Sequence, residues 1–320
     1  MSKYRHRLPH IKDQLFMTDG GLETTLMFHE GVELPAFAAF DLLKDDAGTE
    51  LLRSYFKRYA ELARAHRRGL ILESPTWRAN ADWGAKLGYD ATALADANRK
   101  AIGLMLEIRN AYETAETKIV ISGNIGPRGD GYQAGSRMSA DDAQNYHTRQ
   151  IEIFAQTDAD MLGAFTMNYV EEAIGITAAA KACAMPIAIS FTLETDGRLP
   201  SGDTLAAAIT CTDEETGAYP VYYMINCAHP THFEHVLRDG GAWTGRIRGL
   251  RANASRRSHA ELDESTELDD GNPEELGRQY RELTSLLPRI AVVGGCCGTD
   301  HRHVEAICNA LESEVAEVRA

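Results

Sequence analysis

The stretch Ile290-Ala291-Val292-Val293-Gly294-Gly295-Cys296-Cys297-Gly298 joins a short apolar run to a turn with two adjacent cysteines. An apolar run without polar alternation is typical of a strand that is buried on both faces, as in a parallel sheet. Seven similar runs lie upstream, although Arg246, Arg248 and Arg251 interrupt the last of them. We therefore predict eight strands, at residues 15–18, 70–73, 119–122, 161–165, 187–191, 221–225, 247–250 and 290–293.

Amphipathic helical patterns lie between these runs. Leu52, Tyr55, Phe56 and Tyr59 fall on one helix face. Further helices are predicted at residues 140–157, 170–184, 205–211, 273–287 and 301–318, whereas the polar, mostly acidic segment 253–272 is predicted to be a long surface loop. Eight βα units of this total length match an α/β protein with a single (β/α)8 TIM barrel. A doubly wound sheet gives the same alternation, and spacing alone does not separate the two.

Length and charge restrict the function. A chain of 320 residues accommodates one large barrel or about two ordinary domains. The net charge of −14 argues against nucleic acid and anionic membrane surfaces as partners, because both require a cationic face. No apolar run approaches the roughly 20 residues of a membrane span. The polar, basic start does not resemble a secretory signal, so we expect a cytoplasmic protein.

Three of the six cysteines follow predicted strands. Cys227 comes after the sixth strand, and Cys296 and Cys297 come after the eighth. In a closed barrel these strand ends reach the same rim, where three thiolates make a zinc site with an open fourth position. The competing interpretation is three merely buried or reactive cysteines, and a closed structural zinc site with His229 is a further alternative. A disulfide between Cys296 and Cys297 is not expected, because adjacent cysteines seldom reach suitable geometry.

The other three cysteines, Cys183, Cys211 and Cys308, lie in helical patterns and are interpreted as small apolar core residues. Polar residues also follow other strands. Asp19-Gly20-Gly21 is either a simple turn or a backbone cradle for one end of a ligand. Glu73 is a candidate ligand contact or a solvated carboxylate. Trp77 and Trp83 are packing residues or an aromatic surface for a sulfonium or ammonium group.

The chain resembles the homocysteine S-methyltransferase family, zinc-dependent thiol methyltransferases that include betaine–homocysteine methyltransferase. The resemblance covers residues from about 13 to 310 and rests on the motifs at 19–24, 123–130, 190–191, 226–227 and 294–298. It implies a (β/α)8 barrel over residues 13–320 after an N-terminal tail at 1–12. It also implies zinc as the cofactor and Cys227, Cys296 and Cys297 as its ligands. The substrate-binding candidates are Asp19, Gly20, Gly21, Thr24, Glu73 and Asn226.

The implied reaction moves a methyl group from a sulfonium or ammonium donor to a thiol, with homocysteine as acceptor and methionine as product. The partners are then two small molecules, and no protein residue is assigned as a general base. S-methylmethionine, S-adenosylmethionine and betaine all remain candidate donors. Alternatives are a different thiol or selenol acceptor, a non-catalytic zinc-binding barrel, or a lyase or hydrolase that uses Glu73 and Asp19.

Two positions depart from the family pattern. Phe165 stands where the family usually has a glutamate that holds the substrate ammonium, and the sequence Ala252-Asn253-Ala254-Ser255 replaces a motif close to Pro-Asn-x-Gly. Glu73 occupies a rim position where an uncharged polar residue is usual. Phe165→Glu is therefore expected to improve homocysteine use, unless the acceptor differs or its ammonium partner lies elsewhere.

Overall fold

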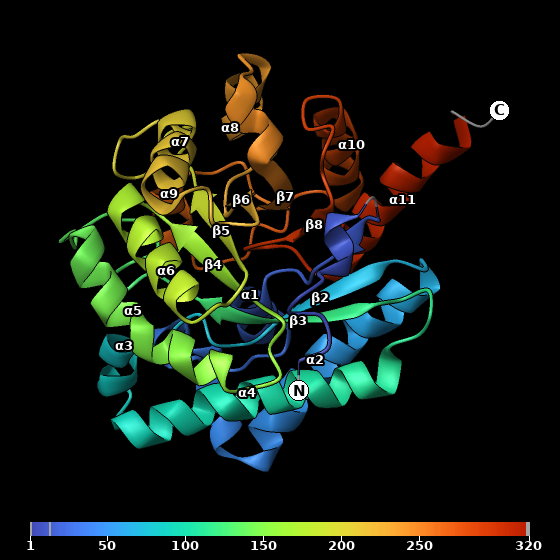
Figure 1. Ribbon diagram of the computed structural model, residues 1–320. Coiled ribbons are helices and arrows are strands. Elements are labelled where there is room, and N and C mark those ends of the chain that lie inside the picture. Colours follow the sequence, from blue (N-terminus) through green and yellow to red (C-terminus); the bar gives the residue numbers. More distant parts are fainter. Residues whose placement is uncertain (1, 13, 318–320) are drawn as a thin grey trace.

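The structure, a computed structural model, describes residues 2–12 and 14–317. Eight parallel strands form one closed barrel in which β1 pairs with both β2 and β8 (Figure 1). The predicted single (β/α)8 barrel is therefore confirmed, and the doubly wound sheet is excluded. The strands are β1 (Phe16–Met17), β2 (Gly69–Glu73), β3 (Ile119–Ile125), β4 (Met161–Met167), β5 (Ile187–Thr192), β6 (Tyr222–Asn226), β7 (Ile247–Ala252) and β8 (Val292–Gly295).

Helices surround the barrel (Figure 1). Those in the predicted positions are α2 (Asp46–Ala65), α5 (Ala140–Ala155), α6 (Val170–Ala182), α7 (Leu205–Thr216), α10 (Pro273–Thr284) and α11 (His301–Glu317). The predicted end of the last helix, Val318, lies outside the described residues. Helices for which no bounds are predicted are α1 (Leu22–Thr24), α3 (Ala81–Lys86), α4 (Ala91–Tyr112), α8 (Pro230–Arg238) and α9 (His259–Asp263).

The barrel interior changes character along its axis. One layer is apolar and consists of inward side chains such as Phe16, Ile71, Val120 and Met161, against which Leu8 of the N-terminal segment packs. Toward the carboxyl ends of the strands the buried residues become polar, and they include Glu73, Ser122, Ser190, Asn226 and Arg251. A second, larger apolar cluster lies between the strands and the helices. The barrel is therefore closed by apolar packing at one end and carries its chemistry at the other.

One expectation from the sequence is incomplete and another is wrong. Segment 253–272 is not simply a surface loop, because it contains α9, which begins with a capping box between Ser258 and Glu261, and its residue His259 is buried. Cys211 is exposed rather than part of the core, because it lies on the outer face of α7. Cys308 is buried as expected, and Cys183 is half-buried at the end of α6.

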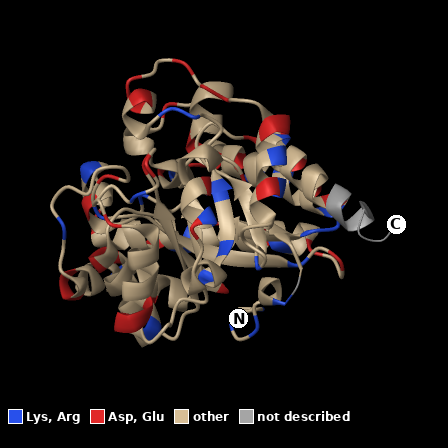
Figure 2. Cartoon of the chain, turned by 90° about the horizontal axis from the view of Figure 1, so that it is seen from above, with Lys and Arg blue, Asp and Glu red and all other residues tan. Residues whose placement is uncertain are grey.

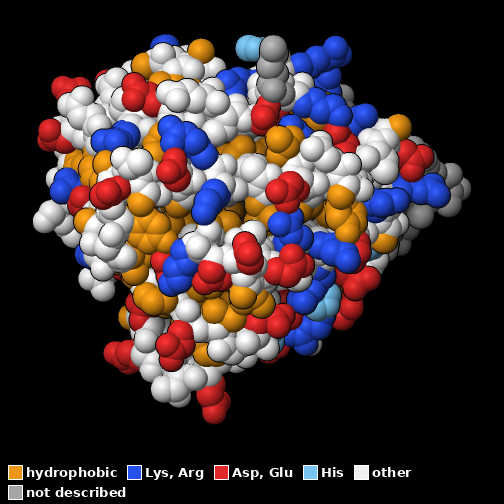
Figure 3. Space-filling model, turned by 90° about the horizontal axis from the view of Figure 1, so that it is seen from below, with side chains coloured by type: hydrophobic (Ala, Val, Ile, Leu, Met, Phe, Trp, Pro, Cys, Tyr) orange, Lys and Arg blue, Asp and Glu red, His pale blue; other side chains and the backbone are white. Residues whose placement is uncertain are grey.

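The outer surface mixes charges. Acidic and basic residues are interspersed over the helices in Figure 2, and the face in Figure 3 carries basic, acidic and hydrophobic side chains together. Within the described part of the chain, no helix combines the length and the apolar character that crossing a bilayer requires. The features that set this barrel apart therefore lie in its interior.

Candidate active site

A cavity of about 550 Å³ opens at the carboxyl ends of the strands. Its wall includes every residue that the sequence analysis proposes for metal or substrate binding: Asp19, Gly20, Gly21, Thr24, Glu73, Asn226, Cys227, Cys296 and Cys297. Residues in or just after β1, β2, β6 and β8, far apart in sequence, thus meet around one space. This end of the barrel is also where (β/α)8 enzymes place their active sites.

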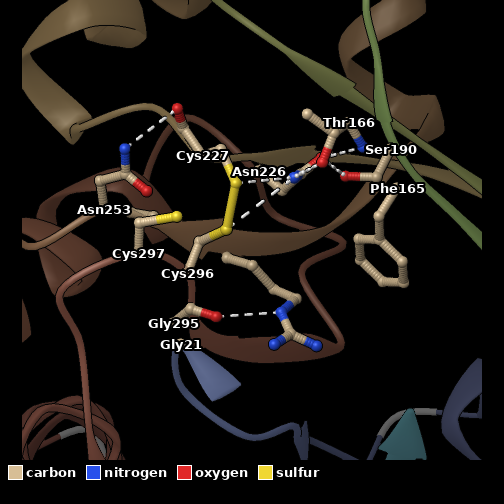
Figure 4. The surroundings of a disulfide bond; sticks show 12 residues. Gly21, Phe165, Thr166, Ser190, Asn226, Cys227, Asn253, Gly295, Cys296 and Cys297 are labelled. Atoms are coloured by element: carbon tan, nitrogen blue, oxygen red, sulfur yellow. Dashed lines mark hydrogen bonds between the residues drawn. A yellow bond between two sulfur atoms is a disulfide. The ribbon is translucent and has the colours of Figure 1, made fainter. Parts of the chain in front are cut away.

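The three cysteine sulfurs form a cluster in this wall, with all three Sγ atoms within 4.8 Å of one another (Figure 4). Cys227 and Cys296 are joined by a disulfide, which the sequence analysis does not anticipate, while Cys297 is free. The Cys297 thiol lies 3.5 Å from the Tyr132 hydroxyl, and burial raises its pKa. Three soft sulfur donors at this spacing can hold a thiophilic metal ion once the disulfide is reduced.

Strand β7 brings the cysteines together. The backbone N–H of Cys227 donates to the Arg251 carbonyl at 3.1 Å, and that of Cys296 donates to the Ala252 carbonyl at 2.8 Å. The glycines before Cys296 are required by packing, because a Cβ at Gly295 would collide with the Thr299 side chain. The adjacent cysteines therefore sit in a turn that is pressed against its neighbours and fixed to β7.

Asn226 orients the first cysteine. Its Oδ1 accepts from the Ser190 hydroxyl at 2.6 Å and from the Thr166 backbone N–H at 3.0 Å. Its Nδ2 donates to Thr166 Oγ1 at 3.0 Å and to Cys227 Sγ at 3.1 Å. Thr166 and Cys227 both have left-handed backbones, with φ of 62° and 53°. Such conformations cluster at functional sites, where the surroundings hold them in place. Thr166 is a site residue that the sequence analysis misses.

Arg251 is a second missed residue. It is buried, and its guanidinium forms an ion pair with Asp19 at 2.7 Å and donates to the Gly20 and Gly295 carbonyls. Tyr55 adds a hydrogen bond to Asp19 at 3.1 Å. Burial raises the pKa of Asp19, and the charge of Arg251 opposes that rise. An arginine inside an apolar run is the sequence signal for this role, although it is interpreted above as an interruption.

Glu73 and Phe165 lie side by side in the interior. A Cβ added to Gly163 of β4 would lie 2.6 Å from the Phe165 ring and 3.0 Å from Glu73 Oε2. Glu73 is 5% exposed, and its Oε2 has no hydrogen-bond partner in the described structure. Burial raises the pKa of Glu73 to about 7, with Arg251 opposing the shift. The Phe165 ring instead faces the guanidinium of Arg251, 5.2 Å from its centroid.

His229 does not join the sulfur cluster. Its ring caps the start of α8 by accepting the Thr231 backbone N–H at 3.3 Å. Among the described residues, the only group of three or more His, Cys, Asp or Glu side chains close enough to share an ion is the cysteine trio. The geometry therefore does not support a closed site with His229 as fourth ligand. The sulfur cluster lies in the cavity wall, with one side open to the cavity.

Comparison with known proteins gives a consistent result. A sequence model of the family described as homocysteine S-methyltransferase matches residues 16–311. A curated relative, homocysteine S-methyltransferase 1 of Brassica oleracea var. italica, is 22% identical over 92% of this chain and 93% of its own. The metallated form of the homocysteine methyltransferase MmuM from Escherichia coli superposes with a TM-score of 0.74, at 18% identity over 93% of this chain and 96% of that one. Its oxidized form gives 0.75, at 19% identity over 98% and 100%. At these identities the solved structures establish a shared fold.

Proposed function

Because the chain belongs to the homocysteine S-methyltransferase family, we propose that it is a zinc-dependent enzyme that methylates the thiol of homocysteine, giving methionine. The methyl donor in this proposal is a sulfonium or ammonium compound: its bond to the methyl carbon breaks as the acceptor sulfur bonds to that carbon, the donor leaves as a neutral sulfide or amine, and the thiol proton is released to solvent. The observation that carries the proposal is the cluster of three cysteine sulfurs within 4.8 Å of one another in the wall of the cavity. A structural role for these cysteines would not require them to face an open space.

The donor set suits Zn²⁺. Three sulfur ligands with one side open to the cavity match a catalytic zinc site, which keeps a position for an exchangeable ligand. Cys227, Cys296 and Cys297 would hold the ion after reduction of the Cys227–Cys296 disulfide. When bound, Zn²⁺ lowers the pKa of a coordinating thiol so that the acceptor is present as the nucleophilic thiolate.

The protein's own residues then position the acceptor. Asp19 is held by Arg251 and Tyr55, and the backbones of Gly20 and Gly21 pack directly on the Thr299 and Cys296 carbonyls. These contacts hold Asp19, Gly20 and Gly21 rigidly in the cavity wall. Alignment of two substrates against such a rigid wall lowers the barrier by converting a bimolecular reaction into an effectively unimolecular one. The mechanism assigns no proton transfer to a side chain.

Glu73 is the group that we assign to the ammonium of the acceptor. The Glu73 side chain lines the cavity beside Phe165, the position at which the family resemblance implies a carboxylate, and its buried Oε2 has no hydrogen-bond partner in the described structure. A buried carboxylate oxygen without a partner is costly, and an incoming cation offsets that cost. The anionic group would then come from β2 rather than from β4, while Thr24 and Asn226 complete the pocket around the acceptor.

The test combines metal analysis with a donor panel. The reduced protein is expected to bind about one equivalent of zinc, as in other sites with three protein ligands, and to form methionine from homocysteine with one of S-methylmethionine, S-adenosylmethionine or betaine. Absence of zinc, together with no protection of thiols when zinc is added, would contradict the proposal. Zinc without turnover indicates a non-catalytic barrel, and turnover of only other thiols or selenols indicates a different acceptor.

A further inference from the structure

Arg78 is clamped in the cavity wall by two tryptophans. Its guanidinium carbon lies 4.0 Å from the ring centroid of Trp77 and 3.8 Å from that of Trp83. One nitrogen, Nη1, donates to the Gly129 carbonyl at 2.9 Å. The residue is only 6% exposed, yet it lines the same cavity as the cysteines. The clamp therefore holds a positive charge at a fixed place in the wall of the cavity that also contains the sulfur cluster.

The charge of Arg78 has no counter-ion among the described residues. Within the described residues, no carboxylate lies close enough to form an ion pair with it, and its Nε is buried without a hydrogen-bond partner. Asp130 and Glu23 are the two carboxylates whose charges act on the Arg78 guanidinium. Asp130, however, already accepts the backbone N–H groups of Tyr132 and Gln133. Burial of an unpaired charge costs free energy, and a bound anion would offset that cost.

The clamp also changes the interpretation of the tryptophans. Trp83 faces the Lys86 ammonium at 3.7 Å in addition to Arg78, so its ring already interacts with two cations of the chain. Trp77 is engaged by Arg78 and donates from its indole N–H to the Phe165 carbonyl at 3.4 Å. These rings hold an arginine rather than a sulfonium or ammonium group of a substrate. The ligand that fits here is an anion.

We propose that Arg78 is the residue that binds the carboxylate of the methyl donor. This inference rests on the proposed methyltransferase function. The Gly129 carbonyl engages only Nη1 of the guanidinium, and the planar donors of a guanidinium match the oxygens of a carboxylate. The aromatic clamp prevents the side chain from swinging away and so lowers the entropy cost of binding.

The neighbourhood favours the donor over the acceptor. Glu23 also lines the cavity and has no ion pair in the described structure. It lies two residues after Gly21, which packs on the Cys296 carbonyl. A zwitterionic donor can therefore place its methyl-bearing cation near Glu23 and the sulfur cluster while its carboxylate reaches Arg78. Glu73, on the other hand, lies beside Phe165 and Gly163 in the barrel interior, where the amino group of the acceptor is assigned.

The experiment compares donors with and without a carboxylate. Binding of S-methylmethionine, glycine betaine and trimethylsulfonium is followed by tryptophan fluorescence, since two of the three tryptophans touch Arg78. Arg78→Gln is expected to weaken a carboxylate-bearing donor about 10- to 100-fold, the usual loss for a charge-assisted hydrogen bond. It should leave trimethylsulfonium unchanged, and Arg78→Lys should recover part of the loss. Arg128→Gln is the control, because Arg128 is an exposed arginine of the neighbouring loop that lies outside the cavity wall.

Steady-state kinetics separates the remaining outcomes. The KM of the carboxylate-bearing donor should rise while the KM of homocysteine stays constant. Equal losses for all donors would show that Arg78 only supports the wall, and a loss for homocysteine but not for 3-aminopropanethiol would assign the carboxylate to the acceptor. Either result overturns the inference, as does failure of both carboxylate-bearing probes to bind. If wild-type protein binds them through Arg78 but forms no methionine, the proposed function fails and the subsite stands.

Discussion

The side-chain amide of Asn226 donates a hydrogen bond to the sulfur of Cys227 at 3.1 Å, while its carbonyl oxygen accepts from Ser190 and Thr166 (Figure 4). Because Thr166 donates through its backbone N–H, the orientation of the amide is determined. The contact ties β4 and β5 to the first sulfur of the cluster. In the proposed zinc site Asn226 would act through Cys227, as residues behind metal ligands commonly do.

Asn226→Ala should weaken zinc binding by the reduced protein about 10- to 100-fold, the range found for groups that orient metal ligands. Competition against a chromophoric zinc chelator measures the change. Ser190→Ala removes only one partner of the amide and should cost less. Unchanged zinc affinity in Asn226→Ala, with the fold intact by circular dichroism, would show that the amide does not position Cys227.

Cys296→Ser and Cys227→Ser should each abolish zinc binding and methyl transfer together, because a single-atom change removes a sulfur ligand without changing the shape of the site. Elemental analysis and methionine formation are measured on the same reduced samples. Cys211→Ser is the matched control, since that cysteine is exposed and lies on α7, away from the cavity. Methyl transfer that survives loss of Cys296 would contradict the role of the sulfur cluster. A lyase or hydrolase that uses Glu73 and Asp19 would instead show its own activity unchanged in Cys296→Ser.

Glu73→Gln should raise the KM of homocysteine by about tenfold through loss of a charge-assisted contact to the ammonium. Phe165→Glu alone should not improve homocysteine use, since the new carboxylate would adjoin Glu73, and two adjacent acids resist joint ionisation. The double variant should recover part of the loss, because it moves the single carboxylate to β4. Improved homocysteine use by Phe165→Glu alone would instead show that Glu73 is not the ammonium partner.

The raised pKa of Glu73 predicts a pH-dependent stability. Burial lifts its pKa from 4.5 to about 7, so the folded protein binds this proton more tightly than the unfolded chain. The contribution of Glu73 to the free energy of unfolding is then full below pH 4.5 and falls as the pH rises toward 7. Glu73→Gln should therefore be more stable than wild type at pH 8, by about 3 kcal/mol at most, and similar near pH 4.5. Urea unfolding at both pH values, with the exposed residue Glu61 changed to Gln as control, measures the difference.

The same titration affects acceptor binding. Only the ionised form of Glu73 attracts an ammonium group, so the KM of homocysteine should rise below pH 7 in wild type relative to Glu73→Gln. Comparison of the two proteins cancels the titration of the substrate thiol, which is common to both. Parallel pH profiles for the two proteins would contradict the assigned role.

Local sequence patterns predict most of the fold because strands buried on both faces need apolar side chains irrespective of their partners. All eight strands are confirmed, including β7 with its arginines. Arg248 and Arg251 are tolerated there because each finds partners: Arg248 donates to the Arg289 and Ile11 carbonyls, and Arg251 pairs with Asp19. In the local sequence pattern these arginines only interrupt an apolar strand. Their partners are distant in sequence, so the pattern does not reveal them.

The segment at 253–272 illustrates the opposite error. Its polar composition is typical of an exposed loop, but His259 is buried and hydrogen-bonds the Cys227 carbonyl, and Leu262, Asp263 and Leu268 line the cavity. Composition describes how a segment partitions between water and protein on average. It does not reveal that a polar segment covers a polar cavity, where hydrogen bonds replace those to water.

The sequence by itself determined the strand pattern, the barrel size and the residues that are capable of binding a metal, because these depend on local hydrophobicity and on the chemistry of cysteine. Closure of β1 on β8 decided what meets at the rim. Only the tertiary structure joined Asp19 to Arg251, placed Glu73 beside Phe165 and clamped Arg78 between Trp77 and Trp83. Charges gain or lose most of their energy through partners within a few ångströms, and in a barrel those partners come from strands that are far apart along the chain.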